Sequence, residues 1–301
     1  MIDYLQMNKF EFSGTGVALI TPFKADHSVD LAALENVVEH VIAGGADYLV
    51  ALGTTSEAPV LDEVEKFRVR ETIISTAAAR VPVVLGVGGN NTSAVVKQLE
   101  HDPMDGFSGI LSVTPYYNKP GQEGLYAHFD AVAKASRLPV ILYNVPGRTA
   151  VNMKASTTLE LAAKHKNIVA VKEASGDMLQ IMNIIRQKPD HFEVISGDDG
   201  ITFPLMAAGA VGVISVAANA FTVDFSAMVN AMLNERFAEA RALHYKMFTL
   251  FGQLFAEGSP AGVKALMSHM NLCDNVVRLP LTRVSDDLAK QIEDQWTLFN
   301  H

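Results

Sequence analysis

The chain has 301 residues and a mass of 32.5 kDa, and 49% of its residues are hydrophobic, so it can bury the core of one large domain or of two average ones. Its net charge of -9 and its lack of a basic cluster exclude the phosphate backbone of a nucleic acid and an anionic membrane surface as expected partners. No apolar run reaches the roughly 18 residues of a membrane span, and residues 1–12 carry no signal-peptide pattern. We therefore expect a cytoplasmic protein.

Short apolar runs alternate with amphipathic segments over the first 224 residues. The predicted strands are residues 17–21, 48–52, 83–87, 109–113, 140–143, 168–171, 192–195 and 210–215, and the helices predicted after the first six are residues 31–43, 62–79, 92–100, 123–136, 154–163 and 178–187. This order predicts right-handed parallel crossovers between the strands. Repeated in eight units, it predicts an α/β fold of the (β/α)8 TIM-barrel type.

The alternative fold is an open, doubly wound sheet. Its dinucleotide-binding form needs a third glycine in the glycine-rich turn, and the candidate residues 86–91 have asparagine there. From residue 225 onward the sequence indicates helices only, with a stripe of apolar residues at helical spacing: Phe237, Leu243, Met247, Leu250 and Leu254. We therefore predict a barrel over residues 1–224 and a C-terminal helical extension over residues 225–301.

Lys172 directly follows the apolar strand at residues 168–171, which resembles a strand buried on both faces. The carboxyl ends of strands carry the chemistry of α/β sheets and barrels, so we expect this lysine at the functional mouth. Three interpretations are open: a structural ion pair with Glu173 or another carboxylate, a phosphate-binding lysine, and a lysine whose neutral amine forms a Schiff base. The residues that follow the other strands must decide among them.

The other strand ends contribute hydroxyl groups, an arginine and acidic groups. In chain order they are residues 53–57 with Thr54 and Thr55, residues 114–118 with Tyr116 and Tyr117, residues 143–149 with Tyr143 and Arg148, and residues 196–199 with Asp198 and Asp199. Each alone has a plainer explanation, since tyrosines often only pack and an arginine often forms a surface ion pair. Together they suit a lysine that attacks a ketone, because hydroxyl groups can pass a proton in both directions.

Rival chemistries fit these residues less well. A metal-dependent aldolase needs clustered histidines, but the nine histidines are scattered and none forms a ligand-like pair at a strand end. A phosphorylated substrate, or pyridoxal phosphate on Lys172, would be repelled by Asp198 and Asp199. The single cysteine, Cys273, excludes an internal disulfide and a cysteine-based zinc site. We therefore expect no metal and no cofactor, and a Schiff base with a small, non-phosphorylated keto acid.

Several of these segments resemble motifs of the dihydrodipicolinate synthase family, also called 4-hydroxy-tetrahydrodipicolinate synthases: residues 53–55, 113–118, 143–149, 171–176 and 212–216. The resemblance covers essentially the whole chain. It implies a class I aldolase on a (β/α)8 barrel, assembled as a homotetramer that is a dimer of dimers. It also implies the reaction, which is the condensation of pyruvate with L-aspartate 4-semialdehyde to 4-hydroxy-tetrahydrodipicolinate, a carbon-oxygen lyase step in the diaminopimelate route to lysine.

The same resemblance implies the roles of four catalytic residues. Lys172 would form the imine with pyruvate, and Tyr143 would act as the proton shuttle. Thr54 and Tyr117 would complete a hydroxyl relay with Tyr143, and the residue matching Tyr117 would reach in from a neighbouring subunit.

Three further residues are assigned to substrate binding by the resemblance. Thr55 would hold the carboxylate of pyruvate, and the backbone carbonyl of Ile214 would face the site. Arg148 would bind the carboxylate of the semialdehyde.

Two features depart from the family pattern. Ser56 stands where the family usually has glycine, and a serine forced to positive φ would lose about 1 kcal/mol relative to glycine. In lysine-inhibited members of the family a glutamate and a histidine help to bind the inhibitor, and here Ala94 and Lys66 take those positions, although Asn90 and Tyr116 match. Since a carboxylate is missing and a cation is added, we expect insensitivity to L-lysine.

Two other functions remain as alternatives. An N-acetylneuraminate lyase or another sugar-acid aldolase would share the imine lysine, but a polyhydroxylated substrate suits neutral groups better than the guanidinium fork of Arg148. A non-catalytic ligand-binding barrel would be favoured by loss of Lys172 or Tyr143, and both are present.

Overall fold

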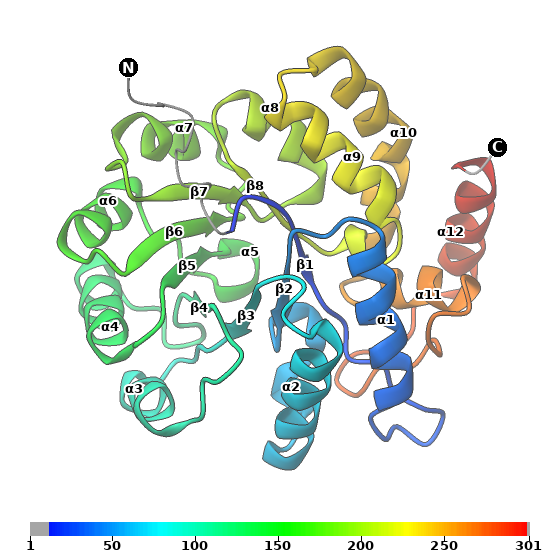
Figure 1. The fold of residues 1–301 in the computed structure, drawn as a ribbon, viewed down its shortest axis with the longest axis horizontal. Helices are drawn as coiled ribbons and strands as arrows, with labels where there is room; N and C mark the ends of the chain where they lie inside the picture. Colours follow the sequence, from blue (N-terminus) through cyan, green and yellow to red (C-terminus); the bar gives the residue numbers. More distant parts are fainter. Residues whose placement is uncertain (1–11, 300–301) are drawn as a thin grey trace.

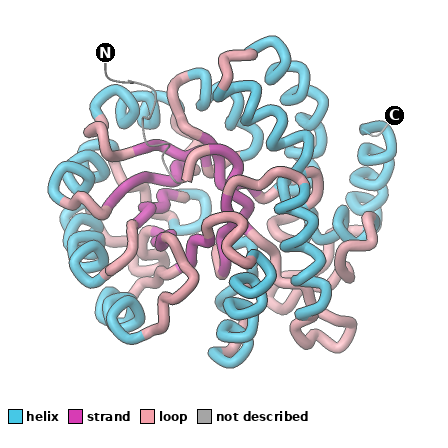
Figure 2. The backbone as a smooth tube through the Cα atoms, viewed as in Figure 1, coloured by secondary structure: helices cyan, strands magenta, loops and turns pink. Residues whose placement is uncertain are grey.

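A computed structural model describes residues 12–299, and within them parallel strands close into a barrel in chain order. Figure 1 shows the strands at the centre of the molecule, and Figure 2 shows helices surrounding them. The strands are β1 (Gly14–Ala18), β2 (Tyr48–Ala51), β3 (Val83–Gly86), β4 (Gly109–Val113), β5 (Val140–Asn144), β6 (Ile168–Glu173), β7 (Glu193–Ser196) and β8 (Gly212–Ser215). The predicted (β/α)8 barrel is confirmed. The first eleven residues, where no signal-peptide pattern was found, lie outside the described range.

Each strand is followed by a helix. These helices are α1 (Leu31–Ala43), α2 (Glu63–Ala77), α3 (Thr92–His101), α4 (Gln122–Ala135), the short α5 (Pro146–Thr149) with α6 (Ala155–Lys164), α7 (Met178–Gln187), α8 (Thr202–Ala207) and α9 (Thr222–Leu233). Asp62 begins α2 with a capping box, in which its side chain accepts from the Glu65 N–H and the Glu65 side chain accepts from the Asp62 N–H. The predicted helices agree with these bounds to within a few residues.

Three more helices complete the chain as the structure describes it: α10 (Phe237–Phe255), α11 (Ala261–His269) and α12 (Asp286–Phe299). They pack together beside α9 at one side of the barrel (Figure 1). In the predicted apolar stripe Met247, Leu250 and Leu254 are fully buried, so this stripe is mainly core. The predicted boundary after residue 224 falls inside α9, and the division into two parts stays a prediction.

β1 spans Gly14–Ala18, whereas the sequence predicted residues 17–21. Close packing requires glycine both on this strand and on the neighbouring strand β8. A Cβ atom on Gly16 would lie 2.3 Å from the ring of Tyr48, and a Cβ atom on Gly212 would lie 2.1 Å from the backbone oxygen of Gly14. β1 therefore packs against β2 and β8 at positions where only glycine fits, and glycine is a poor strand former by itself.

Side chains alternate between the barrel interior and the layer between strands and helices, as they must along a β-strand. The interior cluster contains Phe12, Ala18, Tyr48, Val50, Val84, Leu111, Ile141, Tyr143, Val145, Ala170, Ile195 and Ile214. Residues between these, such as Leu49 and Val171, belong to the outer core. Because Ala170 points inward, Lys172 two residues later also points inward, toward the carboxyl end of the barrel.

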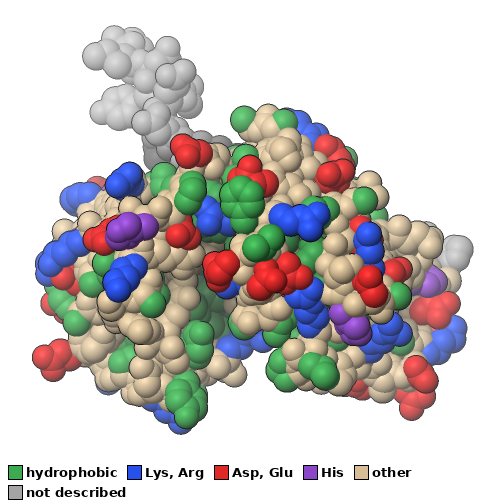
Figure 3. All heavy atoms as spheres, turned by 90° about the horizontal axis from the view of Figure 1, so that it is seen from below, with side chains coloured by type: hydrophobic (Ala, Val, Ile, Leu, Met, Phe, Trp, Pro, Cys, Tyr) green, Lys and Arg blue, Asp and Glu red, His purple; other side chains and the backbone are tan. Residues whose placement is uncertain are grey.

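Acidic and basic side chains are interspersed on the face of the molecule that Figure 3 shows. Among residues 12–299, none of the helices is long and apolar enough to cross a membrane.

Candidate functional site

Lys172 and Tyr143 lie side by side inside the mouth of the barrel. They are direct register partners on the neighbouring strands β6 and β5, and their exposed fractions are only 5% and 6%. The Lys172 Nζ atom lies 4.3 Å from the centre of the Tyr143 ring. An amine and a phenol are thus held in contact, largely screened from solvent, where a nucleophile and a proton donor can act on one substrate.

Gly197, which follows β7, makes room for the lysine side chain. A Cβ atom there would lie 2.7 Å from the Cβ atom of Ala174 and 3.1 Å from the Cε atom of Lys172. A side chain at this position would clash with Ala174 and crowd the side chain of Lys172.

The residues directly after this pair, Asn144 and Glu173, point to the opposite side of the sheet and bind each other. Asn144 Nδ2 donates to Glu173 Oε1 over 2.9 Å, and Glu173 also accepts from the Ser175 N–H over 3.1 Å and from Gln180 Nε2 over 3.1 Å. Both residues are fully buried, and this burial raises the pKa of the Glu173 carboxyl. Neither role was predicted from the sequence, where Glu173 was only a possible ion-pair partner of Lys172, although both residues immediately follow predicted catalytic residues.

The threonine turn, residues 53–57, follows β2. Thr55 is buried with an exposed fraction of 4%, whereas Thr54 is exposed at the surface of the mouth. Ser56 lies in a 3-10 turn (Thr54–Ser56), and its Oγ atom donates to the Gly53 carbonyl over 2.7 Å. Ser56 is not among the residues of positive φ, so the cost of a serine forced to positive φ does not arise here. The left-handed residue is Glu57, with φ 56°.

The other predicted catalytic residue, Tyr117, projects from the molecule. Its side chain is 87% exposed and its φ is 71°, a left-handed conformation that is uncommon for a tyrosine. Within residues 12–299, the hydroxyl groups of Thr54, Tyr117 and Tyr143 form no hydrogen bonds with one another. The proposed relay is therefore not formed inside one chain, and it stays a prediction.

The predicted substrate-binding residues differ in burial. Arg148 is exposed on the short helix α5, and the described part of the chain offers it neither an ion pair nor a hydrogen bond through its guanidinium group. Thr149 beside it is buried and accepts a hydrogen bond from Thr114 Oγ1 over 3.3 Å, which ties α5 to the end of β4. Ile214 lies on β8 opposite Gly16 with its side chain inside the barrel. Their roles in binding stay predictions.

Asp199 supports the loop that follows β8. One carboxylate oxygen accepts from the Ala217 N–H over 2.8 Å and from the Val216 N–H over 3.2 Å, while the other is buried without a hydrogen-bond partner. Burial raises the pKa of Asp199 to about 6. The sequence predicted Asp199 only as a group that repels phosphate, and its hydrogen bonds to the backbone give it a structural role as well.

The positions that depart from the lysine-inhibited pattern are also visible. Lys66 forms an ion pair with Glu63 over 2.8 Å, so the cation at this position is accompanied by a carboxylate on the same helix. Ala94 lies in the first turn of α3 and leaves no acidic group there. Insensitivity to L-lysine stays a prediction that rests more on Ala94 than on Lys66.

No group of three or more histidine, cysteine or acidic side chains among residues 12–299 is arranged to hold a metal ion. Cys273 is partly buried, and burial raises the pKa of its thiol to about 11, so thiolate chemistry is disfavoured.

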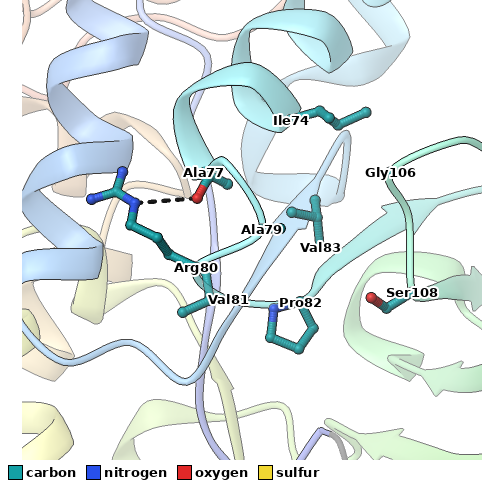
Figure 4. Close-up of a pocket in the computed structure, with 9 residues that line it drawn as sticks. All are labelled: Ile74, Ala77, Ala79, Arg80, Val81, Pro82, Val83, Gly106 and Ser108. Atoms are coloured by element: carbon teal, nitrogen blue, oxygen red, sulfur yellow. Dashed lines mark hydrogen bonds between the residues drawn. The ribbon is translucent and has the colours of Figure 1, made fainter.

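A surface cleft of about 330 Å³ lies at the other end of the barrel (Figure 4). It is lined by residues that precede β3 and β4, and Arg80 at its edge donates to the Ala77 carbonyl over 3.2 Å. Since the carboxyl ends of the strands carry Lys172 and Tyr143, this cleft lies apart from the candidate site.

Comparisons with known proteins identify the family of the chain. The family model described as "Dihydrodipicolinate synthetase family" matches residues 11–297. The chain is 53% identical to the 4-hydroxy-tetrahydrodipicolinate synthase of Parabacteroides distasonis, over 91% of this chain and 93% of that protein. It is likewise 53% identical to the enzyme of the same name from Phocaeicola vulgatus, over 93% and 95%. The crystal structure of dihydrodipicolinate synthase from Aquifex aeolicus superimposes with a TM-score of 0.92 at 41% identity, over 96% of this chain and 98% of that one.

The buried carboxyl of Asp199 predicts a specific dependence of stability on pH. Between its ordinary pKa of 3.8 and its folded-state pKa of about 6, the unfolded chain is ionised while the folded chain holds the proton. The free energy of unfolding should therefore fall through this range as the pH rises, by on the order of 3 kcal/mol from this group. Asp199→Asn removes the group, and urea unfolding of both proteins from pH 4 to pH 7 measures the difference. Parallel curves for the two proteins would contradict the assignment.

Proposed function

The chain belongs to the dihydrodipicolinate synthetase family, and on this basis we propose that it condenses pyruvate with L-aspartate 4-semialdehyde to 4-hydroxy-tetrahydrodipicolinate in the diaminopimelate route to lysine. The observation that carries the proposal is the buried contact between the Lys172 amine and the Tyr143 ring. It excludes water from a nucleophile at the carboxyl end of the strands, where a barrel enzyme places its chemistry.

The proposed reaction starts with the attack of the Lys172 amine on the ketone carbon of pyruvate. Loss of the carbonyl oxygen as water leaves an imine, and Tyr143 supplies the proton that this oxygen needs. Tyr143, which has given up its proton, accepts one from the methyl group, and an enamine forms. The enamine carbon then attacks the aldehyde of the second substrate, and the aldehyde oxygen takes the proton from Tyr143 and becomes the 4-hydroxyl group. The amino group of that substrate then displaces Lys172 and closes the ring, so the lysine is regenerated without a cofactor.

Substrate carboxylates are bound in two places in this proposal. The buried Thr55 and the backbone N–H groups of its turn bind the carboxylate of pyruvate. The exposed Arg148 binds the carboxylate of the semialdehyde, and the carbonyl of Ile214 faces the reacting atoms. Thr54 and Tyr117 pass protons between Tyr143 and solvent.

We also propose that the chain assembles as a homotetramer, a dimer of dimers, in which a second copy covers Tyr117. The support is the exposure of this side chain at 87% and of Tyr116 beside it at 41%, since two neighbouring tyrosines with so much free apolar surface suit a protein interface. For a biosynthetic enzyme of this kind we propose the cytoplasm as its location.

Lys172→Ala should abolish the imine while keeping the fold. After incubation with pyruvate and borohydride, the wild-type chain should gain one reduced pyruvate adduct on the peptide that contains Lys172, and the variant should gain none. Lys264, which is also buried, serves as an internal control because its amine is bound to a carboxylate. A wild-type adduct on any other lysine would refute the assignment.

Tyr143→Phe should lower kcat by roughly two to four decades, the usual value of positioned acid-base catalysis, with little loss of stability. Tyr48→Phe is the matched control, because Tyr48 is also buried inside the barrel and its hydroxyl donates to the Val213 carbonyl over 3.2 Å. The control should keep its rate. Equal rates for Tyr143→Phe and the wild type would leave Tyr143 with a packing role only.

Arg148→Ala should leave pyruvate trapping intact and lower kcat/KM for the semialdehyde by at least about tenfold, since only the second substrate loses a charged partner. Arg148→Lys keeps the charge but loses the planar fork of the guanidinium group. Its kcat/KM for the semialdehyde should lie between those of the wild type and Arg148→Ala. The measurement is a steady-state assay in which each substrate is varied in turn. A loss of pyruvate trapping in Arg148→Ala would show that the residue serves the first substrate instead.

A further inference from the structure

A buried ion pair joins the threonine turn to the C-terminal helices. Lys264 on α11 is fully buried, and its Nζ atom lies 2.5 Å from Glu57 Oε1. The other oxygen, Oε2, accepts from the Arg278 N–H over 2.9 Å. Lys264 Nζ also donates to the Val276 carbonyl over 2.9 Å and lies 4.2 Å from the centre of the Phe23 ring. Both charges are therefore surrounded by partners that come from distant parts of the chain.

Glu57 closes the turn that carries Thr54 and Thr55. It adopts a left-handed conformation with φ 56°, and Leu52 at the start of the turn is also left-handed with φ 52°. Such conformations are unfavourable for residues with a Cβ atom and persist only where surrounding contacts hold them. Among residues 12–299, the hydrogen bonds to the Glu57 side chain come from Lys264 and Arg278, which both follow the barrel in the chain.

We propose that Glu57 and Lys264 form a positioning pair, through which the C-terminal helices hold the threonine turn in the conformation that binds the carboxylate of pyruvate. This inference rests on the proposed function, because it takes Thr55 as the group that binds pyruvate. Neither residue touches the reacting atoms. They act through the backbone of the turn, two residues away from Thr55.

A role in positioning explains why this pair is charged. A buried ion pair adds little net stability compared with well-packed apolar residues, because removing both charges from water offsets their attraction. It does fix the direction of a side chain, since a carboxylate with two donors at set places has few alternative positions. Glu65 offers a comparison within the same region: it binds the Arg278 guanidinium over 2.5 Å, so it also joins the C-terminal segment to the barrel, but it lies on α2 and outside the turn.

The experiment measures the pyruvate concentration that gives half-maximal borohydride trapping, together with the melting temperature. The variants are Glu57→Gln, Lys264→Met, the two combined, and Glu65→Gln as the matched control. Glu57→Gln and Lys264→Met should raise the half-trapping concentration by about tenfold or more, because a small displacement of a binding group weakens its contact strongly. Glu65→Gln should lower the melting temperature and leave the half-trapping concentration unchanged.

The combined variant separates positioning from stability. It leaves no unpaired buried charge, so its melting temperature should recover relative to Lys264→Met, yet its weak pyruvate binding should persist. Pyruvate binding that recovers together with the melting temperature would overturn the inference, as would unchanged trapping in Glu57→Gln or an equal shift in Glu65→Gln. Failure of the wild-type chain to trap pyruvate would instead refute the proposed function.

Discussion

The register between β5 and β6 is the constraint on which the candidate site depends. Tyr143 pairs with Lys172, and Asn144 pairs with Glu173 one residue further along both strands. Because successive side chains point to opposite faces, a slip of one residue would turn one of the first pair out of the barrel. The hydrogen bond between Asn144 and Glu173 lies on the other face of the same two strands and opposes such a slip. The register of these two strands thus places the Lys172 amine and the Tyr143 phenol inside the barrel. It also places the Asn144–Glu173 hydrogen bond on the outer face of the sheet.

Buried carboxylates recur behind the strand-end loops. Glu173 holds the turn after β6, Asp199 holds the loop after β8, and Glu57 holds the turn after β2 from the C-terminal side. Each loses hydration when the chain folds, and burial raises the pKa values of Glu173 and Asp199. Buried carboxylates add little net stability. They do accept hydrogen bonds from particular backbone N–H groups, so each fixes one loop conformation where apolar packing would allow several.

The sequence predicted the barrel and the strand ends because both depend on local patterns. Lys172 was found from an apolar run that ends in a charge, and the order of strands and helices predicted closure. The predicted bounds of β1 were wrong because glycine is required there by contacts with distant residues: Gly16 packs against Tyr48, and Gly212 on β8 packs against the Gly14 backbone. No local pattern reveals such contacts. The Glu57–Lys264 ion pair was not predicted from the sequence either, because its two residues are 207 positions apart in the chain. Contacts of this kind are set by the closed fold and not by neighbouring residues.

The predicted site residues differ in exposure according to what they are proposed to bind. In the proposed reaction Lys172, Tyr143 and Thr55 act on pyruvate, and all three are buried on or beside strands. Arg148 on α5 and Tyr117 on a loop are exposed. A covalent step needs its nucleophile fixed and screened from water before the substrate arrives. A second substrate meets an imine that is already positioned, so its binding group can order on arrival. Loops at the rim can also accept a side chain from another copy without disturbing the strands, which is why the proposed contribution of a neighbouring Tyr117 is compatible with an imine site built within one chain.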